Sequence, residues 1–290
     1  MKLYPFFFFI IWLLVGCAHK YQAPVSQGTL PPVSRHIAWM EGDVENNFEP
    51  NRQVAETRVN TWEGKIPEVA DGENFLEYAA TLGAAGQNAL AEKKLREYLA
   101  KNPNDKKAVF VLAGQYLRTG RKELATYLYQ QLEKDNDFPW KASLLNNLGL
   151  LALREKNRLL GLDYLDRATK ASPASAAPLV NLGSIYLQSR SWSDAEKLFA
   201  RARELDASFE DASIGLGVAL EGQGKLEEAH SVYAEHLGNN KEASSVLFND
   251  AVLLGNRLKR KEEAAELMKR YLQRGGKETA KAHEFIQNWR

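Results

Sequence analysis

Hydrophobic and small residues recur along this chain at a fixed spacing. Three segments that start at Ala142, Ala176 and Glu210 align without gaps at a period of 34 residues. Each segment carries a Leu-Gly pair at its seventh and eighth positions. Small residues and then large apolar residues follow at the same offsets in all three: Gly161, Ala195 and Ala229, then Leu165, Phe199 and Tyr233. A period of this length predicts an array of one repeated structural unit.

The same template extends in both directions. Repeats that start at Gly72 and Lys106 fit upstream, and a two-residue insertion around Trp140 separates the second and third repeats. A sixth repeat starts at Ser244 and needs one inserted residue in its loop. Apolar residues at helical spacing follow it and predict a final helix. These residues are Ala282, Phe285, Ile286 and Trp289.

This pattern resembles the tetratricopeptide repeat, and the resemblance covers roughly residues 72–278. It implies that each repeat is a pair of antiparallel helices, A and B, whose small residues let the two backbones approach. One repeat cannot bury both of its faces, so we expect an all-α, right-handed superhelix of about six helix-turn-helix repeats. The expected repeats are 72–105, 106–139, 142–175, 176–209, 210–243 and 244–278, with a capping helix over 279–290.

The first residues have the pattern of an export signal. Lys2 precedes an apolar run over residues 6–15, which is shorter than the roughly 20 residues that span a bilayer. The run ends in Leu14-Val15-Gly16-Cys17, and Cys17 is the only cysteine. This ending resembles a bacterial lipobox, which implies a signal peptide over 1–16, cleavage after Gly16 and a diacylglycerol on the Cys17 sulfur. An ordinary secretory signal with an incidental cysteine is the alternative.

The residue after the acceptor cysteine bears on location. Ala18 stands where enteric-type lipoproteins that stay at the inner membrane have Asp. The resemblance therefore implies a lipid anchor in the outer membrane, with the protein facing the periplasm.

Residues 17–71 differ in composition from the repeats. Residues 18–71 hold five of the ten prolines, and we expect an extended tether up to about Pro32. Residues 35–66 contain larger apolar side chains, which either cap the first repeat or contact a partner. These side chains are Ile37, Trp39, Met40, Phe48 and Trp62.

Composition and motifs exclude several classes of function. The 38 Lys and Arg residues balance 37 Asp and Glu residues, so a strongly basic nucleic-acid-binding protein is not expected. One cysteine excludes an intramolecular disulfide and a cysteine-based zinc site, and the five histidines form no HExxH motif. We find no nucleophile elbow or phosphate loop. The expectation is a non-enzymatic protein without catalytic residues, metal or cofactor.

The resemblance also implies a concave surface lined mainly by the A helices. Several positions that face it in the family are apolar here, and three repeats carry Asn at their sixth position. An apolar peptide could lie along such a groove, and the Asn amides could bind its backbone. In the alternative, curvature or residues 35–66 fill the groove and make it core. The predicted lining residues are Leu76, Phe110, Leu117, Asn146, Asn147, Leu150, Leu153, Val180, Asn181, Leu187, Ile214, Val218, Phe248, Asn249 and Val252.

These features together predict a lipid-anchored scaffold that binds a protein or peptide partner. By architecture it resembles the pilotin and assembly lipoproteins of type IV and tight-adherence pili, which implies an outer-membrane secretin segment as the partner. Two alternatives remain: an adaptor for peptidoglycan hydrolases or envelope proteases, and a gliding-motility or outer-membrane-assembly lipoprotein.

Overall fold

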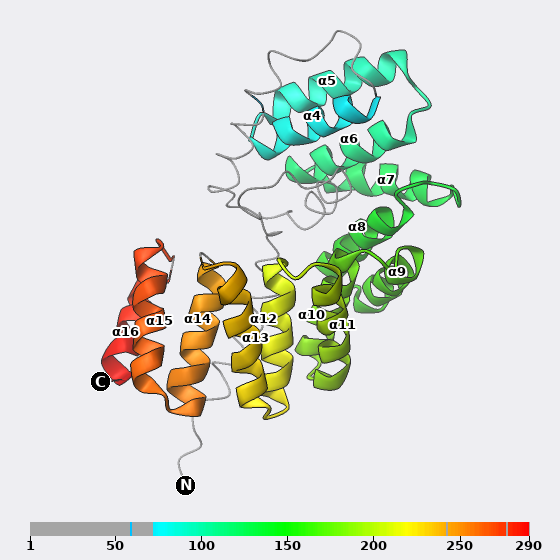
Figure 1. Cartoon of the computed structure of the whole chain (residues 1–290). Helices are drawn as coiled ribbons and strands as arrows, with labels where there is room; N and C mark the ends of the chain where they lie inside the picture. Colours follow the sequence, from blue (N-terminus) through cyan, green and yellow to red (C-terminus); the bar gives the residue numbers. More distant parts are fainter. Residues whose placement is uncertain (1–58, 60–71, 242, 277, 290) are drawn as a thin grey trace. The chain divides into compact units, whose positions relative to one another are not determined.

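The computed structural model describes residues 59, 72–241, 243–276 and 278–289 (Figure 1). Over these residues it contains 13 α-helices and one π-helix, and no strand. The predicted all-α class is therefore confirmed. The signal peptide, Cys17 and the apolar residues picked out between 35 and 66 lie outside the described residues.

The helices follow one another as antiparallel hairpins, one for each of the six expected repeat ranges, although the third hairpin begins one residue before its range, at Lys141. They are α4 (Gly72–Ala84) with α5 (Asn88–Lys101), α6 (Lys106–Arg118) with α7 (Lys122–Glu133), α8 (Lys141–Arg154) with α9 (Arg158–Ala171), α10 (Ala176–Gln188) with α11 (Trp192–Leu205), α12 (Glu210–Gly222) with α13 (Leu226–Asn239), and α14 (Ser244–Leu253) and the π-helix η1 (Leu254–Leu258) with α15 (Lys261–Gln273). The last helix, α16 (Thr279–Trp289), follows the sixth hairpin.

These helices form two compact units, which we describe separately. The N-terminal unit contains α4 to α9 and ends at Pro173, and the C-terminal unit starts at Ala174 and contains α10 to α16. Val59 is buried in the hydrophobic core of the N-terminal unit. This residue of the 35–66 segment therefore contributes to the core of the N-terminal unit.

The Leu-Gly pairs mark close contacts between helices A and B. A Cβ atom on Gly217 of α12 would lie 2.2 Å from the ring of Tyr233, a completely buried residue of α13. A Cβ atom on Gly183 of α10 would lie 3.0 Å from the Phe199 ring of α11. Glycine at the eighth position thus lets the aromatic ring of helix B pack directly on the backbone of helix A.

One residue in every turn between helix A and helix B has left-handed backbone geometry. Three of the six are glycines, as this conformation favours, and three are basic residues. They are Gly86, Gly120, Lys156, Arg190, Gly224 and Lys259, with φ between 59° and 81°. The basic members show that the turn geometry is kept even where the sequence lacks glycine.

The sixth repeat accommodates its extra residue differently from the prediction. We expected the insertion in the loop, but helix A widens into η1, and a π-turn takes up one extra residue. Gly255 of η1 lies against the Trp289 ring, and Asn256 Oδ1 accepts a hydrogen bond of 2.9 Å from Trp289 Nε1. The insertion therefore helps to hold the final helix.

The helix predicted at the end of the chain is α16, which packs on α15. Ala282, Phe285, Ile286 and Trp289 are all buried. The Phe285 ring stacks on Trp289 at 5.2 Å and meets Phe248 edge-on at 6.1 Å. This helix closes the apolar end of the C-terminal unit.

Candidate functional site

The predicted groove residues of the N-terminal unit are mostly buried. Phe110 is 3% exposed, and its ring packs against Tyr129, Phe138 and Trp140 at centroid distances of 5.3 to 5.8 Å. Trp140 is one of the two inserted residues, and Phe138 lies just before the insertion. Leu150 and Leu153 are half-buried, and the other predicted groove residues of this unit are buried. The buried residues are Leu76, Leu117, Asn146 and Asn147.

Asn147 is partly satisfied within its own repeat array. Its Nδ2 donates a hydrogen bond of 3.0 Å to the buried hydroxyl of Tyr129 on α7. Its Oδ1 is buried and accepts no hydrogen bond from any residue that the structure describes. The amide therefore joins two repeats, and its oxygen keeps an unused acceptor.

The C-terminal unit shows the same distribution. Most of its predicted groove residues are buried, whereas Phe248 and Asn249 are half-buried. Phe248 packs on Tyr271, and Asn249 Nδ2 donates to the Ser245 carbonyl of its own helix at 2.8 Å. The buried members are Val180, Asn181, Leu187, Ile214, Val218 and Val252. Peptide binding by these predicted groove residues stays a prediction. The half-buried side chains of Phe248 and Asn249 are the accessible members of the set.

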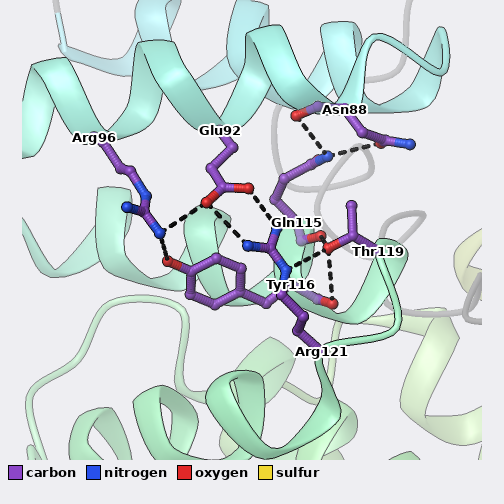
Figure 2. A network of polar contacts seen from close by, with 7 residues as sticks. All are labelled: Asn88, Glu92, Arg96, Gln115, Tyr116, Thr119 and Arg121. Carbon is purple, nitrogen blue, oxygen red and sulfur yellow. Dashed lines mark hydrogen bonds and ion pairs between the residues drawn. The ribbon is translucent and has the colours of Figure 1, made fainter.

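A polar network that the sequence analysis missed ties the first two repeats together (Figure 2). Glu92 on α5 accepts hydrogen bonds from Arg121, one of them 3.0 Å from Nη1 to Oε1, and forms an ion pair with Arg96 at 2.8 Å. Arg96 also donates to the Tyr116 hydroxyl at 3.1 Å. Arg121 holds the pKa of Glu92 below its usual value, chiefly through these hydrogen bonds. The network fixes the turn after α6 against α5.

A second part of this network contains one contact between the same repeats and one within the turn after α6. Gln115 Nε2 donates to Asn88 Oδ1 at 2.7 Å, and Arg121 Nε donates to the Thr119 hydroxyl at 3.0 Å. The sequence signal for these contacts is a set of polar residues 27 and 29 positions apart. That separation becomes meaningful only once the repeat boundaries are known.

Two carboxyl groups of the C-terminal unit are shielded from water, of which Asp250 is buried and Glu221 is half-buried. Glu221 Oε1 accepts a hydrogen bond of 3.2 Å from the Tyr233 hydroxyl, and burial raises the pKa of Glu221 to about 7. Asp250 Oδ1 lies 2.7 Å from His230 Nδ1. Burial raises the pKa of Asp250, although the contact with His230 acts in the opposite direction. Burial disfavours the charged form of a carboxyl group. These acids therefore make the packing of this unit sensitive to pH.

The two histidines of α13 pair with neighbouring helices. His230 meets Asp250 of α14, and His236 Nδ1 lies 3.0 Å from the Ser213 hydroxyl of α12. Ser213 and His236 are both at most 1% exposed, so a substrate could not reach this pair. Burial and the nearby Arg203 charge lower the pKa of His236. The pair contributes to helix packing.

No group of three or more His, Cys, Asp or Glu side chains among the described residues is placed to hold a metal ion. None of the helices that the structure describes has the length and apolar character needed to cross a bilayer.

Comparison with known sequences identifies the repeat. The sequence profile of the tetratricopeptide repeat matches residues 79–139, 146–208, 180–245 and 214–279, which together cover more than half of the chain. The chain belongs to the tetratricopeptide repeat family. The predicted repeat fold is thereby confirmed, and this family generally consists of non-enzymatic scaffolds for protein–protein interaction. A search of curated protein sequences finds no match to this chain.

Solved structures show the same fold at low sequence identity. The structure of the APC/C hetero-tetramer Cut9–Hcn1 aligns with 97% of this chain at 15% identity and a TM-score of 0.62. This tetratricopeptide repeat chain spans only 52% of that longer chain. YrrB, a TPR protein described as having an unusual peptide-binding site, aligns with 66% of this chain and 96% of its own at 18% identity and a TM-score of 0.50. A MamA structure aligns with 58% of this chain and 97% of its own at 18% identity and a TM-score of 0.49.

Proposed function

We propose that this protein is a lipid-anchored scaffold on the periplasmic face of the outer membrane. The observation that carries the proposal is the tetratricopeptide repeat array, because stacked helical hairpins of this family serve to bind other polypeptides. The lipobox-like Leu14-Val15-Gly16-Cys17 supports the membrane attachment. Two or three acyl chains would give stable anchoring where a single chain would not.

The partner proposed is an apolar or amphipathic peptide segment. The predicted lining residues that are only half-buried offer apolar surface and one side-chain amide to such a segment. They are Leu150 and Leu153 of α8 and Phe248 and Asn249 of α14. Within either unit, an extended or helical segment can contact such side chains along the A helices of that unit. The peptide-binding site described for YrrB shows that a protein of this fold can hold a peptide.

The machine that we propose is a pilus or secretin system. A tethered array raises the local concentration of binding sites at the membrane without adding a contact, which suits a protein that gathers subunits for assembly. The support for this choice is the similarity of architecture, a lipobox followed by about six repeats, to pilus-assembly lipoproteins.

Affinity purification of the full chain from crosslinked native membranes tests the proposal. We expect a secretin or another pilus component to co-purify. Co-purification of amidases, endopeptidases or a periplasmic protease without pilus components would instead support the hydrolase-adaptor alternative. Leu150→Glu should reduce recovery of the partner, whereas Gln131→Glu, which adds the same charge at an exposed position of α7, should not.

A further inference from the structure

The predicted groove residues of the first two repeats are closed to solvent. Leu76 is 2% exposed, Phe110 3% and Leu117 4%. In the third repeat of the same unit, Leu150 and Leu153 are only half-buried. The concave face of a stacked array is ordinarily an open binding surface. Such burial indicates that a cover lies over the first two repeats and ends near the third.

Two parts of the chain outside the helices of these repeats contribute to the cover. Phe138 and Trp140 pack on the Phe110 ring. Val59 is 1% exposed and belongs to the same hydrophobic cluster as the closed groove residues. It is the one residue before α4 that the structure describes, so the chain is already inside this cluster before the first helix begins. The sequence that leads to Val59 is therefore the part of the chain best placed to cover the face.

The segment directly before Val59, residues 35–58, has the composition and the length for this role. It holds large apolar side chains, which a solvated tether does not need. These side chains are Ile37, Trp39, Met40 and Phe48. Its 24 residues reach up to roughly 80 Å when extended. Packed helices lie about 10 Å apart, so a part of the segment is enough to cross α4 and α6.

We infer that residues 35–58 lie along the A-helix face of the first two repeats as an intramolecular ligand of the array. Val59 fixes one end of the segment in the core, which gives the segment a high effective concentration beside the face. Its apolar side chains then fill the groove as an apolar peptide would. The inference goes beyond the proposed function and does not depend on it, because the occupant is part of this chain. It leaves Leu150 and Leu153 as the accessible predicted groove residues of this unit for a separate partner.

Photocrosslinking of the purified full chain tests which molecule occupies the face. A photoreactive residue in place of Phe48 should form an adduct with α4 or α6 at the mass of a single chain, mapped by mass spectrometry of peptides. The same residue in place of Gln27, in the expected tether, should not react with these helices. Adducts at the mass of two chains would identify a second copy as the occupant and overturn the inference. Absence of adducts on α4 and α6 would overturn it too.

The reactivity of a single thiol measures the cover itself. In full chains that carry Cys17→Ser, Leu117→Cys and Leu187→Cys each place one cysteine at the twelfth position of a repeat, one in each unit. Both leucines are buried, with exposed fractions of 4% and 1%. Deletion of residues 35–58 should speed labelling at position 117 at least about tenfold, because a buried thiol reacts only when its cover opens. Labelling at position 187 should stay close to that of the undeleted chain.

Deletion of residues 18–34 is the matched control and should change labelling at neither position. Circular dichroism checks that each variant keeps its helices. Unchanged labelling at position 117 in a helical deletion variant would contradict the inference, and so would equal acceleration at positions 117 and 187. If the 35–58 deletion unfolds the protein, the Phe48 adduct decides alone.

Discussion

Lys225 Nζ lies 3.0 Å from Glu196 Oε2, and these two residues hold the same repeat positions as Arg121 and Glu92. In both pairs the acid lies on helix B of one repeat and the base directly before helix B of the next. Gln223 adds a hydrogen bond of 2.6 Å to Glu196. The contact is therefore a repeated element of the array that holds successive turns in register, once in each compact unit.

Glu92→Gln tests this element. Glu92 is mostly shielded from solvent, so we expect a loss of about 1 kcal/mol in the free energy of unfolding at pH 7. Because the pKa of Glu92 is lowered in the folded state, its contribution is present above its ordinary value of 4.5 and is lost as the pH falls through the folded pKa. Urea unfolding at several pH values should show the two proteins converging in acid.

Glu97→Gln is the control for that experiment, because Glu97 is 53% exposed and meets Lys93 only at 3.9 Å. It should change stability little at any pH. A Glu92→Gln deficit of the same size at pH 7 and in strong acid would show that the ion pair is not its cause.

Glu221→Gln should have the opposite dependence on pH. Burial raises the pKa of Glu221 from 4.5 to about 7, so ionisation lowers stability as the pH rises between these values. Gln keeps an acceptor for the Tyr233 hydroxyl without the charge. We expect the variant to gain up to about 2 kcal/mol over the parent between pH 5 and pH 8. Denaturant unfolding at both pH values measures this, with the exposed Glu228→Gln as the control.

The basic residues with left-handed backbone predict stabilising substitutions. Lys156 and Arg190 have φ of 62° and 59°, a conformation that disfavours side chains with a Cβ atom. Lys156→Gly and Arg190→Gly should each stabilise the protein by up to about 1 kcal/mol. Gly224→Ala is the reverse experiment, because no atom lies within 4 Å of the added methyl and only the backbone conformation opposes it. Thermal unfolding of all three variants should give Gly224→Ala a lower unfolding temperature than the parent.

Gly255→Ala should loosen the final helix. The added Cβ atom would lie 2.2 Å from the Trp289 ring, so α16 must shift and its hydrogen bond to Asn256 must lengthen or break. Hydrogen exchange over residues 279–289 should then become faster. Gly238→Ala in α13 is the control, because no atom lies within 4 Å of its added methyl. Faster exchange of α16 in that variant too would disconnect the effect from Trp289.

The sequence pattern predicts which helices pair but not how completely each face is covered. The Leu-Gly pairs located the contacts of Gly183 with Phe199 and Gly217 with Tyr233, because small and large residues recur at fixed offsets. Phe110 was predicted to line the groove, yet Phe138 and the inserted Trp140 pack on its ring. A pattern of single repeats cannot show where an insertion folds back.

The contacts between repeats were harder to foresee for a different reason. Glu92 and Arg121 are 29 residues apart, and neither belongs to the repeated set of small and large apolar positions. The number of residues in the sixth repeat is compatible with an extra residue either in the loop or in a widened helix. The hydrogen bond from Trp289 to Asn256 explains why the helix takes it up.

Site-specific photocrosslinking in native membranes tests the scaffold function most directly. A photoreactive residue in place of half-buried Leu150 should form an adduct with another polypeptide, and the same residue at exposed Gln131 should not. Introducing Cys17→Ser should reduce the adduct, because the array would no longer be held at the membrane. Absence of a protein adduct from position 150, or equal adducts from both positions, would contradict the account.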